Sequence, residues 1–459
     1  MWLEHLTASV LNRMTAKRTP ATPSGLLLGK TVEPPHQRIV LPDGQRCQHA
    51  VVLGKTGSGK TYLLESLAWQ LAKRGEGFAF LDFHGDSSLS LIGRLLELSS
   101  SPDRLVILDP SHPTRSPGIN VLEAGDSEAE RFRKVSELSA ILRQRWSVES
   151  FGARTEELLR NSLYTLAAGG LTLADLPRFL ADSRLRLQLV DRLEHPDIAS
   201  YWRERYEPLS EAMKGAFREP LLNKVTGFLT EPAARHLLGQ RTSTIDITAV
   251  MQARQWLIVR LPKGRLRDAA HTLGNLLFAQ LQFAALARES LPAGQRHTFT
   301  LLCDEAQNLA ENDLQTLLTE GRKFGVSVIT ANQFWEQLPR ELRGALLSAN
   351  AHICFRVSST DAPILAGELN LQQKGRLTGE LTNLTQGEAI ANVGNHGVVR
   401  FRVPALPTVR PITPHELDSL IEPVTRDRGE IERTLRPAIE PIAETVVTPT
   451  PVEEGQHDW

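Results

Sequence analysis

The chain has 459 residues, of which 41% are hydrophobic and 23% charged, and this length favours two domains with additional end segments over a single core. Its 52 basic and 53 acidic side chains leave a net charge of −1, which excludes attraction of a polyanion by the surface as a whole. Three cysteines without C-x-x-C spacing, and no apolar run near the roughly 18 residues that cross a bilayer, predict a cytoplasmic protein with no integral membrane segment.

Residues 1–46 form an N-terminal segment with mixed composition and several prolines. Two short stretches in it, 25–28 and 38–41, have the apolar character of strands. We expect this segment to lay a small β-element over the site formed by the residues that follow.

The sequence HAVVLGKTGSGKT at residues 49–61 is the strongest motif of the chain. A short apolar run reads as a buried strand, and the pattern G-x-x-x-x-G-K-[ST] begins directly after it. Glycines let backbone N–H groups approach phosphate oxygens, Lys60 supplies a charge to the outer phosphates, and Thr61 offers a hydroxyl to Mg²⁺ and opens a helix. The residues predicted to bind the nucleotide are Gly54, Lys55, Thr56, Gly57, Ser58, Gly59, Lys60, Thr61 and Tyr62. The strand before the loop and the apolar periodicity after it distinguish the motif from a glycine-rich turn without a ligand.

Two further apolar runs, 78–82 and 105–109, each end in an aspartate, and a predicted helix around 91–98 separates them. Continuously apolar strands that alternate with helices indicate an α/β fold with a parallel sheet covered on both faces. Ligands gather at the carboxyl ends of such strands. Asp82 and Asp109 are therefore either ligand-facing groups or caps of their own loops.

From about Ser127 the strand signal disappears for more than a hundred residues. Ser127 and Glu130 form a capping box, and helical periodicity follows, so we expect an inserted all-α domain at 126–248. It carries the aromatic residues Trp146, Tyr201, Trp202 and Tyr206 beside Arg145, Arg203 and Arg205. This mixture predicts either a surface that stacks on bases or ordinary helix packing.

The sheet resumes with predicted strands at 256–261, 299–303, 326–331 and 352–357, with a long helix at 268–288. A hairpin at 387–403, with its turn at 394–397, closes the folded part. Beyond it, residues 404–459 contain many prolines and few aromatic residues, and we expect a mostly disordered tail.

The run that ends at Cys303 is followed by two adjacent acids. After a complete phosphate-binding loop, this pairing predicts that Asp304 helps to hold hydrated Mg²⁺ and that Glu305 polarises the attacking water. Two neighbouring carboxylates repel each other, so the arrangement makes most sense beside a cation.

Two more residues flank the strand at 326–331. Arg322, in EGRKFG, places a guanidinium just before the strand, and Gln333, in ITANQ, places an amide just after it. We predict that Arg322 is an arginine finger for a neighbouring subunit and that Gln333 senses the γ-phosphate; the alternatives are a solvated arginine and a helix-capping glutamine. Nothing near Lys60 or Glu305 in the sequence supplies the extra cation that phosphoryl transfer requires.

With these motifs in place, residues 45–403 resemble the HerA/FtsK superfamily of ring ATPases, and most closely the DNA-binding ATPases of type IV secretion called coupling proteins. The resemblance rests on GKTGSGKT, LDFHGD, LLCDEAQ, EGRKFG and ITANQ in the family's order, and on the position of the helical insertion. It implies a RecA-like doubly wound sheet, ATP and Mg²⁺ as cofactors, and a homo-hexamer that moves DNA. Typical coupling proteins begin with membrane helices, which this chain lacks.

The resemblance also suggests where DNA would bind. Lys263, Arg265 and Arg267 cluster in a predicted flexible turn after a strand and are either a DNA contact or a solvated turn.

The predicted organisation is an N-terminal segment (1–46), a first nucleotide-binding part (47–125), the all-α domain (126–248), a second nucleotide-binding part (249–403) and the tail (404–459). The predicted function is a DNA-translocating coupling ATPase of conjugation or type IV secretion, with a relaxase or secretion machinery as partner. Three alternatives stay open: a HerA-like motor that works with a nuclease in repair or defence, an ATPase that moves protein, and a nucleotide-binding scaffold without hydrolysis. The presence of Glu305 and Arg322 argues against the scaffold.

Overall fold

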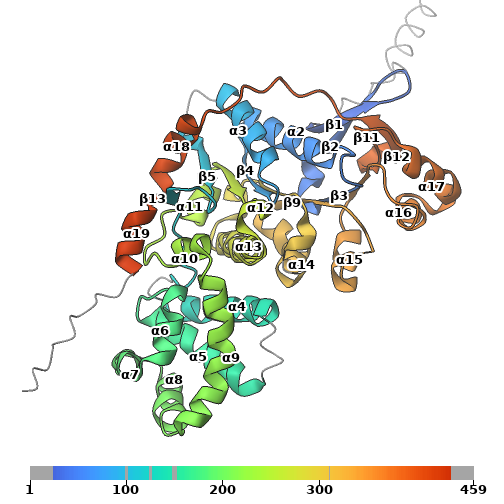
Figure 1. Cartoon of the computed structure of the whole chain (residues 1–459). Helices are drawn as coiled ribbons and strands as arrows, with labels where there is room; N and C mark the ends of the chain where they lie inside the picture. Colours follow the sequence, from blue (N-terminus) through green and yellow to red (C-terminus); the bar gives the residue numbers. More distant parts are fainter. Residues whose placement is uncertain are drawn as a thin grey trace, which may run out of the picture.

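The computed structural model describes residues 24–98, 102–123, 127–146, 152–309, 311–336 and 338–435. Within these residues an 11-stranded sheet runs through the molecule, helices cover both of its faces, and a separate helical lobe projects from it (Figure 1). The strands are β1 (Gly25–Thr31), β2 (Arg38–Pro42), β3 (Ala50–Leu53), β4 (Gly77–Asp82), β5 (Leu105–Leu108), β6 (Arg115–Ser116), β7 (Trp256–Arg260), β8 (Phe299–Cys303), β9 (Val326–Asn332), β10 (Ala351–Cys354), β11 (Glu388–Asn392), β12 (Val398–Arg402) and β13 (Arg426–Asp427).

The helices follow the strands in the alternation that the sequence predicts. They are α2 (Lys60–Lys73), α3 (Asp86–Leu98), α4 (Glu128–Trp146), α5 (Ala153–Ala168), α6 (Leu176–Ala181), α7 (Ser183–Val190), α8 (Pro196–Ser200), α9 (Glu211–Leu229), α10 (Pro232–Leu238), α11 (Ile247–Gln252), α12 (Lys263–Leu266), α13 (Ala269–Ala287), α14 (Glu311–Glu320), α15 (Arg340–Leu347), α16 (Ala362–Leu369), α17 (Lys374–Asn383), α18 (Pro414–Ile421) and α19 (Arg428–Leu435). The short turns used below are the π-helix η5 (Tyr201–Tyr206) and the 3₁₀-helices η8 (Ala306–Asn308), η9 (Gly321–Phe324) and η11 (Gly394–His396).

The strand order is β2-β1-β12-β11-β10-β3-β9-β8-β4-β7-β5. From β10 to β5 every neighbouring pair is parallel, whereas the pairs from β2 to β10 are antiparallel. Parallel strands need crossover connections, which here are helices, and the antiparallel end contains the predicted hairpin, β11–η11–β12. The strands predicted at 25–28, 38–41, 78–82, 105–109, 256–261, 299–303, 326–331 and 352–357 are confirmed, with ends that differ by a few residues.

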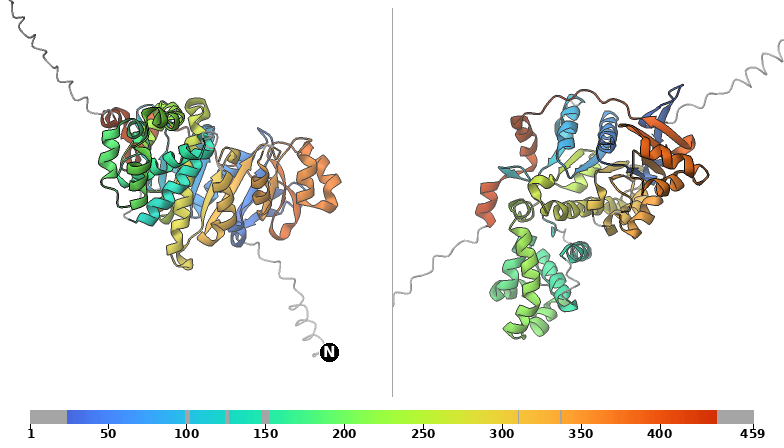
Figure 2. Two further views of the ribbon diagram at one scale, coloured as in Figure 1. Left: turned by 90° about the horizontal axis from the view of Figure 1, so that it is seen from below. Right: turned by 45° about the vertical axis from the view of Figure 1, so that its right-hand side comes forward.

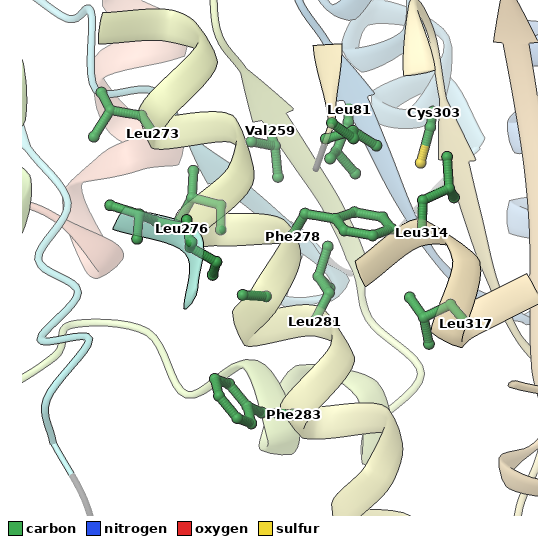
Figure 3. Close-up of a cluster of buried hydrophobic side chains, with 14 of the residues drawn as sticks. Leu81, Val259, Leu273, Leu276, Phe278, Leu281, Phe283, Cys303, Leu314 and Leu317 are labelled. Carbon is green, nitrogen blue, oxygen red and sulfur yellow. The ribbon is translucent and has the colours of Figure 1, made fainter. Parts of the chain in front are cut away.

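Alternating side chains of the parallel strands enter two separate cores, because the pleat points neighbours to opposite faces. Val52 packs with α2 and α3 on one face, and Val51 and Leu53 pack on the other. That second face is covered by α13, which is apolar around most of its circumference. Figure 3 shows Phe278 and Leu281 of this helix between the sheet and α14. The parallel strands are therefore covered on both sides, and the loops at their carboxyl ends extend beyond the two cores.

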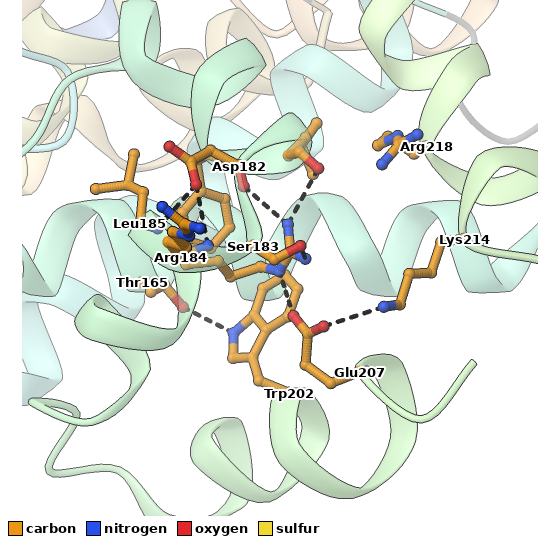
Figure 4. A network of polar contacts seen from close by, with 12 residues as sticks. Thr165, Asp182, Ser183, Arg184, Leu185, Trp202, Glu207, Lys214 and Arg218 are labelled. Atoms are coloured by element: carbon orange, nitrogen blue, oxygen red, sulfur yellow. Dashed lines mark hydrogen bonds and ion pairs between the residues drawn. The ribbon is translucent and has the colours of Figure 1, made fainter. Parts of the chain in front are cut away.

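The helical lobe is built from α4 to α9 and extends away from the sheet (Figures 1 and 2). Trp202, at its centre, is fully buried, and its Nε1 donates to the Oγ1 of Thr165 at 2.9 Å. Arg186 is also buried and pairs with Glu207, which in turn accepts from Lys214 (Figure 4). A buried network of this kind fixes how the helices pack.

Of the two interpretations of the lobe's aromatic residues, ordinary helix packing is the one that the structure supports where it describes them. Tyr201, Trp202 and Tyr206 are 8%, 0% and 2% exposed and pack on one another in edge-on and stacked contacts. Arg203 and Arg205 pair with acids of the lobe itself. Ordinary helix packing therefore explains this mixture; the side chains of Arg145 and Trp146 lie outside the described part.

The prediction of a mostly disordered tail is wrong for residues 404–435. After β12 the chain crosses the outer side of α3, where Arg94 donates to the backbone carbonyl of Pro407 at 3.2 Å. It then forms α18, β13 and α19, whose Ile421 and Ile431 are buried. Proline here favours an extended path across the surface, and two well-placed isoleucines anchor the segment. The remaining residues, 436–459, lie outside the described residues, and no described helix is long and apolar enough to cross a bilayer.

Candidate nucleotide site

The loop between β3 and α2 has the backbone conformation that its sequence motif requires. Gly59 has a φ of 118° and precedes α2, and a Cβ at Gly54 would lie 2.7 Å from the Cβ of Phe355. Both positions therefore require glycine. The Oγ of Ser58 is buried and has no hydrogen-bond partner among the described residues. The loop thus presents an unsatisfied polar group at a helix N-terminus, which suits an anionic phosphate.

Lys60 is the first residue of α2 and is 7% exposed. Its Nζ reaches back across the loop and donates to the backbone carbonyl of Lys55 at 3.1 Å. Burial lowers the pKa of Lys60, and the charges of Asp304 and Glu305 oppose that shift. The ammonium group is thus held inside the loop, where it can meet the outer phosphates of a nucleotide.

Thr61, the second residue of α2, and Asp304, which directly follows β8, lie in contact beside the phosphate-binding loop. The hydroxyl of Thr61 donates to Oδ2 of Asp304 at 2.7 Å, and Asp304 is 2% exposed. Burial raises the pKa of Asp304, while the hydrogen bond from Thr61 opposes the shift. A hydroxyl and a carboxylate side by side are hard oxygen ligands that fit Mg²⁺.

Glu305 has a left-handed backbone conformation, with a φ of 53°, and its carboxylate is surrounded by donors. Nε2 of His84 lies 2.8 Å from Oε1, and Gln333 donates to the same oxygen. Oε2 accepts from Nζ of Lys263 at 2.8 Å and from Nδ2 of Asn308 at 3.3 Å. Burial alone would raise the pKa of Glu305, but the hydrogen bonds from Lys263 and His84 outweigh it and lower the pKa to about 2.

Gln333 connects this carboxylate to the phosphate-binding loop. Its side-chain carbonyl accepts from the hydroxyl of Thr56 at 3.2 Å while its amide donates to Glu305. Because β9 lies between β3 and β8 in the sheet, a residue at its carboxyl end stands between the two other components of the site. The position suits the γ-phosphate sensor that the sequence predicts.

Arg322 lies at the opposite edge of the sheet. It belongs to η9, which precedes β9, whereas the loop follows the carboxyl end of the parallel strand β3. Arg322 is exposed and lines a cavity of about 590 Å³ together with His49 and Asn350. The structure therefore does not bring this guanidinium to the phosphate-binding loop of its own chain.

The three predicted DNA-contact residues are not in a flexible turn. Residues 263–266 form the short helix α12, and Lys263 pairs with Glu305, while Arg265 and Arg267 are exposed. The expected turn is thus a short helix, and one of its three cations lies at the nucleotide site, while contact with DNA stays a prediction.

Sequence reasoning missed two side chains beside Glu305, the cation Lys263 and the imidazole of His84. His84 follows β4 and Lys263 follows β7, and both strands lie on the same side of β8 in the sheet order. The only signal was the strand end LDFHGD, because nothing in the spacing of the residues reveals which strands are neighbours. No further cation lies near Glu305 in the sequence, but Lys263, which is distant in sequence, contacts Glu305 in the structure.

The two other strand-end aspartates have structural roles. Asp82 accepts hydrogen bonds from the backbone N–H groups of His84, Gly85 and Ser88 and so caps the start of α3. Asp109 pairs with the buried Arg260. Loop capping thus explains Asp82, which also fixes the loop that carries His84.

The structure defines the class of P-loop nucleotide-binding proteins by three features: a parallel sheet covered on both faces, a glycine-rich loop that opens a helix, and an acidic pair at the next-but-one strand.

Comparison with known proteins shows which members of this class the chain is similar to. Residues 46–161 match the family described as "Helicase HerA, central domain". Type 4 coupling protein DotL of Legionella pneumophila is 23% identical over 369 residues, which cover 67% of this chain and 47% of DotL. The chain thus spans about half the length of this relative.

Solved structures of coupling proteins share the fold. Unbound TrwB, a bacterial conjugative coupling protein, superposes with a TM-score of 0.60 at 19% identity, covering 88% of this chain and 93% of that chain. TrwB in complex with ADP and Mg²⁺ gives 0.60 over 82% and 90% of the two chains, also at 19% identity. VirB4 of Thermoanaerobacter pseudethanolicus gives 0.53 at 13% identity, over 86% and 98%. The predicted RecA-like fold is confirmed, and the chain is similar in sequence to the HerA central domain and to the coupling protein DotL, and in fold to TrwB.

Proposed function

We propose that this protein is a Mg²⁺-dependent ATPase that moves DNA as a ring-shaped homo-oligomer, in the manner of a conjugation or type IV secretion coupling protein. The observation that carries the proposal is the convergence of Lys60, the Thr61–Asp304 pair and the Glu305–Gln333 pair at one edge of the sheet. These groups come from three strand ends, and together they provide phosphate binding, metal binding and water activation.

Each group has a definite task in this proposal. Lys60 and the loop amides bind the β- and γ-phosphates of ATP, and Thr61 and Asp304 hold the metal. Mg²⁺ bound there would neutralise charge on the phosphates. Glu305 orients and deprotonates the attacking water, and Gln333 reports occupancy of the loop through its contact with Thr56.

DNA and the ring are supported by the relatives and by Arg322. TrwB and DotL are coupling proteins, and the exposed position of Arg322 at the far edge of the sheet suits a residue that completes the site of a neighbouring subunit. We propose a homo-hexamer in the cytoplasm with a relaxase or the secretion machinery as partner. The match of residues 46–161 to the HerA central domain favours, as a second candidate, a motor that works with a nuclease.

The test is the rate of ATP hydrolysis with and without duplex and single-stranded DNA, measured beside the mass of the assembly. Lys60→Ala should lose ATP binding, because the loop loses the charge that offsets phosphate repulsion. Glu305→Gln should bind ATP and fail to hydrolyse it, because the amide cannot accept the proton of water. DNA binding should weaken steeply with salt. Unchanged ATP affinity in Lys60→Ala, or turnover at the parental rate in Glu305→Gln, would contradict the assignment of the site.

A further inference from the structure

The carboxylate of Glu305 has a donor at every position where it can accept a hydrogen bond. A carboxylate offers about four lone-pair positions on its two oxygens. His84 and Gln333 meet Oε1, and Lys263 and Asn308 meet Oε2. In this arrangement Glu305 cannot accept a proton from water until one donor leaves.

The four donors differ in how easily they can leave. Asn308 lies three residues from Glu305 and also donates to its backbone carbonyl at 2.8 Å. Gln333 is held at the phosphate-binding loop by Thr56. The loop of His84 is fixed because Asp82 accepts its backbone N–H at 2.9 Å. Asn308 and Gln333 are thus tied to the site by second contacts, and His84 is anchored through its backbone, while its side chain is 56% exposed.

Lys263 differs from the other three donors in its charge and its surroundings. Its side chain is 31% exposed, compared with 56% for that of His84, its charge sits at the end of a flexible four-carbon stem, and its Nζ lies over the ring of Phe83, 5.6 Å from the centroid. Arg265 and Arg267, in the same short segment, are exposed. A polyanion that approaches these cations therefore reaches Lys263 from outside, and a phosphate oxygen can replace the carboxylate as its partner.

We propose that Lys263 is a positioning residue that restrains Glu305, and that the phosphate backbone of DNA releases this restraint by taking over Lys263. The inference rests on the proposed function and adds a regulatory route to it. Without DNA, Lys263 keeps Oε2 occupied and turnover is slow. With DNA on α12, Oε2 becomes free to accept the proton of the attacking water, so hydrolysis rises only when there is DNA to move.

The experiment compares Lys263→Met with the parental chain, using ATP and a duplex DNA fragment. The variant should hydrolyse ATP without DNA on the order of tenfold faster, as expected for removal of one charge-assisted hydrogen bond, with its KM for ATP unchanged. Added DNA should stimulate it little or not at all. Lys263→Arg retains the ion pair and should restore slow basal turnover. Lys224→Met, at an exposed lysine of α9 in the helical lobe, is the matched control and should behave as the parental chain.

Two results would overturn the inference. Slower basal turnover in Lys263→Met would mean that Lys263 supplies charge to the transition state, and parental stimulation by DNA in that variant would mean that DNA acts elsewhere. A parental protein that hydrolyses ATP at a rate insensitive to DNA would instead contradict the DNA part of the proposed function. In that case the basal rate decides: a rise in Lys263→Met supports the restraint, and an unchanged rate overturns it.

Discussion

The two edges of the parallel sheet are built in opposite ways. At the carboxyl edge Lys60, Asp304 and Glu305 are buried, and each one contacts polar partners from neighbouring strand ends. At the amino edge Arg322 is exposed beside a polar cavity of about 590 Å³. The charges at the first edge are paired within the chain, whereas the guanidinium at the second edge is exposed. This difference is the reason why we propose that a site nearly complete in one subunit depends on Arg322 of the next.

The largest expected effect comes from removing the charge at the amino edge. Arg322→Ala should bind ATP normally and hydrolyse it about 10³–10⁵-fold more slowly, the range known for arginine fingers. The structure makes this test sharper, because Lys263 already places a cation beside Glu305 in the same chain. If that cation suffices for phosphoryl transfer, Arg322→Ala will retain most of the parental rate.

Mixing two inactive variants distinguishes action within a subunit from action between subunits. Lys60→Ala and Arg322→Ala should together regain activity, because an intact Lys60 can then lie beside an intact Arg322 of the neighbour. The recovery should rise with protein concentration if assembly is required. Lys323→Ala, at the adjacent exposed cation, is the control and should remain active. No recovery from variants that demonstrably co-assemble would exclude a finger that acts between subunits.

A smaller effect, on stability, should follow from breaking the pair that holds the carboxyl edge together. Arg260 is 7% exposed and Asp109 is 2% exposed, and Arg260 also donates to the hydroxyl of Ser88 at 3.1 Å. Arg260→Met leaves a buried carboxylate unpaired and should lower the free energy of unfolding by about 3–5 kcal/mol. Urea unfolding followed by tryptophan fluorescence measures this loss.

The matched control for this pair is a double variant. Replacing Asp109 by leucine in the Arg260→Met background removes the unpaired charge and should restore much of the lost stability. A loss of less than about 1 kcal/mol in the single variant would mean that the pair behaves like an exposed one.

The sequence predicted the components of the site that lie on consecutive residues. The loop from Gly54 to Thr61 and the pair Asp304–Glu305 are local patterns whose chemistry follows from residue type and the adjacent strand. His84 and Lys263 could not be predicted, because their proximity to Glu305 depends on the order β8-β4-β7, which local patterns do not encode. Contacts between side chains at different strand ends depend on which strands are neighbours in the sheet, and the sequence alone does not show this.

The same limit explains why the sequence leaves two interpretations of the lobe's aromatic residues open. The burial of Trp202 depends on how α5, η5 and α6 pack around it, and composition cannot distinguish a buried aromatic cluster from an exposed one. The wrong prediction for the tail has another cause. The segment 404–435 does contain a local helix signal, because Thr413 and Glu416 form a capping box at the start of α18. The many prolines obscure this signal, and the burial of Ile421 and Ile431 becomes visible only in the structure.

The smallest expected effect is a pH dependence of the free energy of unfolding, which we attribute to His49 at the amino edge. His49 is 4% exposed, and its Nδ1 accepts from the backbone N–H of Val328 at 3.1 Å. Burial lowers the pKa of His49 to about 4, against an opposing hydrogen bond with the backbone of Leu318. The folded state therefore keeps this ring neutral where the unfolded state, with an ordinary pKa near 6.5, takes up a proton.

The sign of the effect follows from this difference in bound protons. Between about pH 6.5 and 4 the unfolded state binds more protons, so the contribution of His49 to stability is present above this window and is lost as the pH falls through it. The loss is at most about 3.5 kcal/mol, since one pKa unit corresponds to about 1.4 kcal/mol and the pKa falls from 6.5 to about 4. In His49→Asn the amide oxygen can accept from Val328 without titrating, so urea unfolding should depend less on pH across this window than in the parental chain. His415→Asn, at an exposed histidine of α18, should keep the parental dependence. Equal slopes in all three proteins would show that His49 takes up its proton as readily in the folded chain as in the unfolded one, and that the amino edge is open to water beneath Arg322.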